Sequence, residues 1–279
     1  METTKIAIFK GKQIRKVLHN NEWWFVVNDV VESLTDSHDP AQYFKRLKIR
    51  DPELAKLTIK GVVQFVPPLM LTIKTSGGNQ KAYCWHTEGI FRLIQSIPSS
   101  KAEPFKRWLA KVGYERIQEI ENPELATKRT RMLYKLKGYS GDWIEKRMRG
   151  IVIREELTDE WQKRGAEEKR DYEILTAEIS KAIFGVTPSE YKKLKGLQRE
   201  NLRDHMDDFE LIFTMLGEKS TSEIHRQEES KGVPKLRKDA QRGGKVAGVA
   251  RKELEKELGR SVVSNKNYLS KTKQTKSLY

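Results

Sequence analysis

Residues 23–34 read WWFVVNDVVESL, and within this stretch a strand pattern passes directly into a helix pattern. The run of aromatic and β-branched residues at 23–27 is typical of a buried strand. Asn28 and Asp29 are residue types that cap helices, so a helix is expected to follow at 30–34. This junction predicts an N-terminal domain in which strands and helices share one core.

Further strand and helix signals surround this junction. Gly11 and the sequence SGGN at residues 76–79 mark hairpin turns, because glycine adopts positive φ angles without strain. Strands are predicted at residues 5–9, 13–17, 23–27, 62–66, 69–73 and 81–85, and helices at 30–34, 40–49, 88–95 and 101–120. Residues 1–120 are therefore expected to form an α+β domain, a small mixed or antiparallel sheet with helices.

Residues after 120 carry mainly helical signals. The sequence TPSE at 187–190 is a strong start signal, with a capping threonine, a proline at the first helical position and a glutamate three residues after the cap. Gly185 is expected to close the preceding helix. Helices are predicted at residues 124–137, 142–149, 167–184, 202–216 and 234–258, with a strand at 151–153 as the one alternative to helix. The C-terminal half is thus expected to be mainly α-helical.

The charge of the chain is distributed unevenly. Of 279 residues, 54 are basic and 39 acidic, which gives a net charge of +15. The net charge is +7 over residues 1–120 and +10 over 231–279, but −5 over 158–230. Excess positive charge attracts polyanions, and an asymmetry of this kind suggests separate surfaces for separate partners.

Pattern and charge together predict four segments. They are an α+β domain at 1–120, a helical connector at 121–157, a helical partner-binding domain at 158–259 and a basic tail at 260–279. The tail is polar and rich in lysine without an apolar face, so disorder is expected there.

Cations in three places are candidates for contact with the phosphates of a nucleic acid. Helices 30–34 and 40–49 are joined by a short polar loop, and the second is basic, as in a helix-turn-helix unit. The hairpin around residues 76–79 carries a lysine on each side, and the helix at 234–258 is strongly basic. The candidate residues are Lys45, Arg46, Lys48, Arg50, Lys74, Lys81, Lys235, Arg237, Lys238, Arg242, Lys245 and Arg251.

Two other clusters offer chemistry, and each has a structural alternative. Cys84 and His86 share one face of a predicted strand, as a nucleophile and base would, or as a packed cysteine and a hydrogen-bonded histidine. Asp204, Asp207 and Asp208 could hold a magnesium ion in a nuclease, or form the solvated acidic start of a helix. Phosphate-loop and zinc-protease motifs are missing from the sequence. We therefore expect no catalytic residue, metal or cofactor.

The sequence also bears on location. No stretch approaches the ~18 uninterrupted apolar residues of a membrane span, and the first residues lack the pattern of a signal peptide. The single cysteine, Cys84, fits a reducing compartment. A cytoplasmic protein without membrane contact is expected.

Spaced motifs in the N-terminal domain resemble the Bro family N-terminal domain. They are IRKV at 14–17, WWFVVNDVV at 23–31, TEGIFRLI at 87–94 and AEPFKRWL at 102–109. Bro-N proteins occur as phage antirepressors, in large DNA viruses and in prophage-like bacterial genes, and their domain is associated with DNA binding. The resemblance covers about residues 5–120 and implies DNA binding without supplying a catalytic residue.

The second half is similar to the family of DNA-damage-inducible protein D. The similarity rests on residues 191–197, on DHM at 204–206 with the following Glu210-Leu211, and on GGKV at 243–246 with the helix through Leu258. It implies a role in the bacterial DNA-damage (SOS) response and action on RecA recombinase filaments.

The combined expectation is a non-enzymatic regulatory protein, active in transcription regulation or the DNA-damage response, that binds DNA and a protein partner. The partner would be a repressor, RecA recombinase or a second copy of the chain. The alternative is a protein-only modulator, an antirepressor or a RecA-filament modulator, in which DNA contact is secondary. A magnesium-dependent nuclease is the third hypothesis.

Overall fold

The computed structural model describes residues 5–9, 12–62 and 64–269. The chain divides into two compact units, Met1–Pro123 and Glu124–Tyr279. This boundary lies close to the expected one at residue 120. The expected connector at 121–157 is not a separate body, because nearly all of it belongs to the helical unit.

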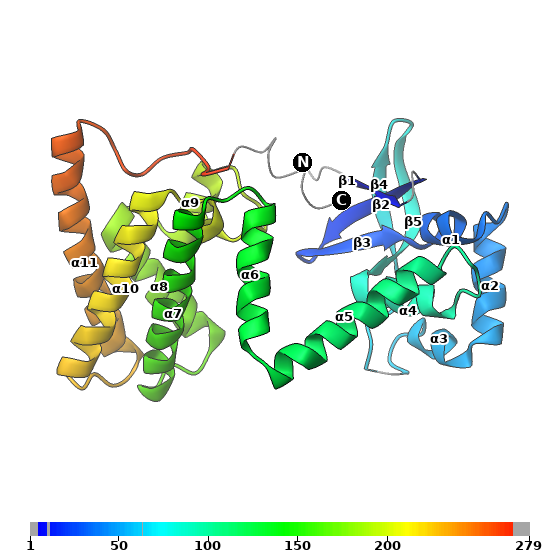
Figure 1. Ribbon diagram of the computed structural model, residues 1–279, viewed down its shortest axis with the longest axis horizontal. Coiled ribbons are helices and arrows are strands. Elements are labelled where there is room, and N and C mark those ends of the chain that lie inside the picture. The colour runs from blue at the N-terminus through cyan, green and yellow to red at the C-terminus, as the bar shows by residue number, and fades with distance from the viewer. Residues whose placement is uncertain (1–4, 10–11, 63, 270–279) are drawn as a thin grey trace. The chain divides into compact units, whose positions relative to one another are not determined.

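The described strands of the first unit form a five-stranded antiparallel sheet in the order β1-β2-β3-β5-β4 (Figure 1). Asn20 and Asn21 both have positive φ angles, 48° and 62°, and so turn β2 back into β3. Gly78, with φ 109°, lies at the β4–β5 turn, as the sequence predicts. The strands are β1 Lys5–Phe9, β2 Lys12–His19, β3 Glu22–Val26, β4 Leu69–Thr75 and β5 Gly78–His86.

Helices cover one face of this sheet around a core centred on the fully buried Trp85. Leu34, Leu93 and Ile97 from the helices and loops pack into the same cluster. The opposite face has a smaller core of its own, which includes Trp24, Ile73 and Cys84. The helices are α1 Val27–Thr35, α2 Pro40–Arg50, α3 Pro52–Leu57, α4 Thr87–Ser96 and α5 Glu103–Glu121. The expected α+β class is confirmed.

Two local predictions in this unit are wrong. No strand forms at the described residues 62 and 64–66. The described residues there are not in a strand or helix, and the Val66 carbonyl oxygen accepts a hydrogen bond of 2.8 Å from Trp85 Nε1. Helix α1 begins at Val27 without a side-chain cap. Asp29, expected as a possible cap, accepts bonds of 2.9 Å and 2.7 Å from the Arg15 guanidinium and thereby ties α1 to β2.

The second unit is helical in the part that the structure describes. Gly185 ends α8 with φ 78°, and Thr187 and Glu190 form the predicted capping box at the start of α9. Its elements are α6 Glu124–Leu136, α7 Gly141–Lys163, α8 Lys169–Phe184, α9 Pro188–Leu194, the 3₁₀ helix η1 Leu202–His205, α10 Asp208–Gln227 and α11 Val233–Leu258.

Helix boundaries in this unit correct two further predictions. Residues 151–153 lie inside α7 and not in a strand. The single helix expected at 202–216 is two elements, because the Asp207 side chain accepts the backbone N–H of Glu210 and starts α10 there.

Helix α11 is continuous through Gly243 and Gly244, although glycine is a poor helix former. These glycines serve close packing against neighbouring helices. A Cβ atom on Gly244 would lie 2.7 Å from Ala182 Cβ and 2.8 Å from the Ile179 carbonyl oxygen of α8. A Cβ atom on Gly243 would lie 2.6 Å from the Thr221 backbone of α10. The two glycines therefore let α11 approach both helices more closely than any other residue type permits.

Residues 260–269 differ from the disordered segment that their composition predicts. Val262 and Leu269 are buried in the core of the helical unit. The Lys195 ammonium donates a bond of 2.6 Å to the Lys266 carbonyl oxygen, and the Tyr268 ring stacks on Tyr139 at 5.7 Å. Composition alone predicts disorder here because the segment has few apolar side chains. These side chains nevertheless pack against residues that are distant in the sequence. The rest of the predicted tail, 270–279, lies outside the described residues.

Within the described ranges, no helix has the length and apolar character needed to cross a membrane.

Candidate nucleic-acid interface

Helix α2 buries two apolar residues and exposes most of its basic residues, together with Ile49. Asp39 caps it by accepting the Gln42 backbone N–H at 2.9 Å, and Pro40 occupies the first turn. Phe44 and Leu47 are buried in the core. Lys45, Arg46 and Arg50 are exposed, and Lys48 is half-buried with its ammonium 5.1 Å from the centre of the Phe44 ring. The exposed side of α2 is therefore cationic.

Asp51 fixes the end of α2. Its carboxylate caps α3 by accepting the Leu54 backbone N–H at 2.9 Å, and it also accepts bonds from Arg92 at 2.8 Å and Ser96 at 2.6 Å in α4. Burial alone would raise the pKa of Asp51. The bonds from Ser96, Leu54 and Arg92 outweigh this effect and lower the pKa to about 2. The ionised Asp51 side chain thus links the end of α2 to α3 and α4.

The β4–β5 hairpin carries the two candidate lysines beyond the rest of the sheet. Only residues 84–86 of β5 pair with β3, whereas residues 78–84 pair with β4, so the turn extends past β3 (Figure 1). Lys74 lies opposite Asn79, and Lys81 lies opposite Thr72. Side chains alternate along a strand, so Lys74 and Lys81 occupy the same face of the hairpin.

That face is the one that α2 covers. Tyr83 follows Lys81 by two residues and therefore lies on the same side of β5. Its ring contacts Phe44 of α2, with the ring centres 6.2 Å apart. The basic helix and the lysines of the hairpin consequently belong to one side of the first unit.

These cations have no compensating carboxylate among the described residues. In the ranges that the structure describes, none of them forms an ion pair. Exposed charges without partners keep their long-range attraction for an anion, apart from screening by salt. The six residues, called the α2–hairpin cations below, are Lys45, Arg46, Lys48, Arg50, Lys74 and Lys81.

The cations predicted on the second basic helix lie in the other unit, on α11, and most of them are paired. Arg237 binds Glu178, and both Lys235 and Arg242 bind Glu228 and Asp239. Arg251 is buried, donates a bond of 2.7 Å to the Ile183 carbonyl oxygen and pairs with Glu255. Lys238 and Lys245 are exposed and have no ion pair within the described chain. Much of the charge on α11 is therefore engaged in contacts within the helical unit itself.

The cysteine and histidine considered as a nucleophile and its base are packed inside the first unit. Cys84 and His86 lie buried on one face of β5, as their spacing predicts. Burial raises the pKa of the Cys84 thiol to about 11, so it is protonated at neutral pH and is a poor nucleophile. The centre of the His86 ring lies 5.6 Å from that of the buried Trp24.

The aspartates near residue 204 are likewise engaged. Asp204 accepts bonds from Arg147 at 2.8 Å and Tyr134 at 3.0 Å. Asp207 caps α10, and Asp208 pairs with Lys146 at 3.0 Å. Among the described residues, no group of three or more His, Cys, Asp or Glu side chains is placed to hold a metal ion.

One feature of the helical unit was missed in the sequence. Lys192, Arg199 and Arg203 line a pocket together with Glu218 of α10. Local patterns give no signal for this grouping, since the four residues belong to three helices and a loop that meet only in the folded unit.

Comparison with known proteins gives a result for the first unit only. Residues 13–117 match the family described as BRO family, N-terminal domain. A search of curated proteins gives no match to the chain. The matched segment begins in β2, ends in α5 and contains all six α2–hairpin cations. The comparison therefore identifies a Bro-N domain at residues 13–117.

Proposed function

We propose that the chain is a DNA-binding regulatory protein of the phage antirepressor type, in which α2 and the β4–β5 hairpin contact the phosphates of double-stranded DNA. A Bro-N domain is consistent with such a regulator. The observation that carries the proposal is that the α2–hairpin cations, on one side of that domain, form no ion pair within the part of the chain that the structure describes. By contrast, the cations of α11 are largely neutralised by internal ion pairs.

On that side of the domain, α2 and the β4–β5 hairpin are proposed to make different contacts with DNA. The hydrogen bonds from Arg92 and Ser96 to Asp51 fix the end of α2. The exposed arginines of α2 offer hydrogen-bond donors in the planar arrangement that suits phosphate oxygens. The hairpin extends past β3 and can reach an adjacent phosphate or groove. Phosphate contacts of this kind provide affinity and orientation, and base contacts decide the sequence.

The helical unit is proposed to bind a protein partner, a repressor or the RecA recombinase, without catalysis. The net charge of −5 over residues 158–230 supports a surface distinct from the DNA-binding one. The same region contains the capping boxes that begin α8 and α9 and the ion pair of Glu178 with Arg237 of α11.

The test is binding of the full chain to a fluorescent DNA duplex, followed by anisotropy at several salt concentrations. Binding at about 50 mM salt that weakens steeply by about 200 mM supports phosphate contact. Absence of binding at the lowest salt refutes the DNA proposal. Capture of purified repressor or RecA without DNA would then favour the protein-only regulator.

A further inference from the structure

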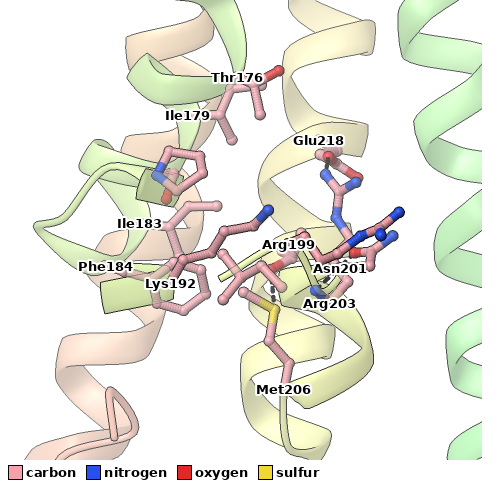
Figure 2. A pocket seen from close by; sticks show the side chains of 14 residues that line it. Thr176, Ile179, Ile183, Phe184, Lys192, Arg199, Asn201, Arg203, Met206 and Glu218 are labelled. Carbon is pink, nitrogen blue, oxygen red and sulfur yellow. Dashed lines mark hydrogen bonds and ion pairs between the residues drawn. The ribbon is translucent and has the colours of Figure 1, made fainter. Parts of the chain in front are cut away.

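A pocket of about 420 Å³ lies inside the helical unit, where α8, α9, η1 and α10 meet (Figure 2). Ile179, Ile183 and Phe184 of α8, with Leu202 and Met206, form its apolar part, and all five are buried. Known small-molecule pockets have volumes of about 300–1,000 Å³ and combine an apolar lining with a few polar groups. The size and lining therefore suit an organic molecule better than a single inorganic ion.

The polar part of the lining is cationic. Lys192, Arg199 and Arg203 face one carboxylate, Glu218, so the lining has a net charge of +2. Arg203 pairs with Glu218, whereas Lys192 and Arg199 form no ion pair in the described part of the chain. Figure 2 shows the Lys192 ammonium pointing toward the side where Arg203 and Glu218 pair. The expected ligand thus carries negative charge.

Glu218 adds an independent sign of a ligand. It is 2% exposed, and its Oε1 atom is bound by Arg203 and, at 3.5 Å, by Arg154. Its Oε2 atom is buried and has no hydrogen-bond partner among the described residues. A buried acceptor of this kind is unusual, because an unsatisfied polar group is destabilising. A ligand that donates a hydrogen bond here would satisfy it.

Asn201 supplies a hydrogen-bond donor that complements the Glu218 acceptor. Its side-chain oxygen accepts the Arg203 backbone N–H at 3.0 Å, which leaves the amide nitrogen as a donor at the pocket wall. A carboxylate acceptor and an amide donor beside an apolar wall match the polar edge and the flat faces of a nucleobase. Two partner-free cations match the double negative charge of a phosphate monoester.

We propose that this pocket binds a free nucleoside monophosphate, with the phosphate against Lys192 and Arg199 and the base against Ile179, Ile183 and Phe184. The site lies wholly within the helical unit and does not depend on the DNA contact of the Bro-N domain.

The test is isothermal titration of the full chain, without DNA, with AMP as the probe and with adenosine and inorganic phosphate as comparison ligands. AMP is expected to bind at least about tenfold more tightly than either, because each lacks one of the two contacts. Lys192→Gln and Arg199→Gln are each expected to weaken AMP binding about tenfold. They should leave adenosine binding and the melting temperature unchanged.

Lys193→Gln is the matched control, since Lys193 is exposed on the same helix and does not line the pocket. It removes the same charge and should leave AMP binding unchanged. The proposal is overturned if AMP does not bind, if AMP binds no more tightly than adenosine, or if the control weakens binding as much as Arg199→Gln. These outcomes are separable from the DNA proposal, because that proposal is tested by DNA titration alone.

Discussion

Removal of Arg46 and Arg50 from α2 offers a quantitative test of the DNA contact. Log Kobs falls with log salt by about 0.9 for each phosphate neutralised. If all six α2–hairpin cations touch phosphates, the slope for the full chain is about −5, and affinity falls about a thousandfold between about 50 mM and 200 mM salt. Arg46→Gln/Arg50→Gln should reduce the slope by about two units and weaken binding about 60-fold at about 0.1 M salt.

The assay is fluorescence anisotropy with a duplex oligonucleotide across that salt range. Both arginines are exposed and form no ion pair in the described chain. The free energy of unfolding of the double variant should therefore lie within ~0.5 kcal/mol of that of the parent. Lys238→Gln/Lys245→Gln removes the same charge from exposed positions on α11 and should leave the slope unchanged. Equal loss of slope in both variants would refute a local contact at α2 and indicate a general effect of net charge.

Three further predictions concern stability and reactivity. Gly244→Ala should destabilise the helical unit by about 1–3 kcal/mol in chemical denaturation, because its Cβ atom would overlap Ala182 and the α8 backbone. Gly113→Ala, where a Cβ atom meets nothing within 4 Å, should be neutral or stabilising, and equal losses would contradict the packing argument. Because the pKa of Asp51 is about 2 in the folded protein against 3.8 in the unfolded chain, its stabilising effect exists above pH 3.8 and is lost as pH falls toward 2. Asp51→Asn should lower stability at neutral pH and flatten the acid part of the stability curve, and an unchanged curve would refute its role. The Cys84 thiol, with a pKa of about 11, should react with a thiol reagent at pH 8 only after unfolding, and rapid reaction of the native protein would contradict its burial.

Local sequence signals succeeded where neighbouring residues decide the structure. The glycine turn before β5, the capping box of Thr187 and Glu190, and the glycine that ends α8 each depend on a few adjacent positions. The Bro-N domain was also foreseen, because its motifs occur in order along the chain.

Long-range pairing was beyond these signals. Helical spacing places Arg237 and Arg251 on α11, but it does not reveal that Glu178 and the Ile183 carbonyl oxygen lie beside them. The same reason explains the pocket around Lys192 and Glu218. It also explains residues 260–269, whose few apolar side chains are buried by distant partners.

The packing of residues 260–269 has a consequence for synthesis of the protein on the ribosome. Tyr268 stacks on Tyr139 and lies 5.3 Å from the Trp143 ring, at the start of the helical unit. The growing chain therefore contains the Bro-N domain long before the helical unit can complete its core. Domains made first can fold first, whereas exposed apolar surface invites aggregation. Between the release of α7 and the arrival of residue 268, the aromatic surface around Trp143 therefore lacks the part of its cover that Tyr268 provides.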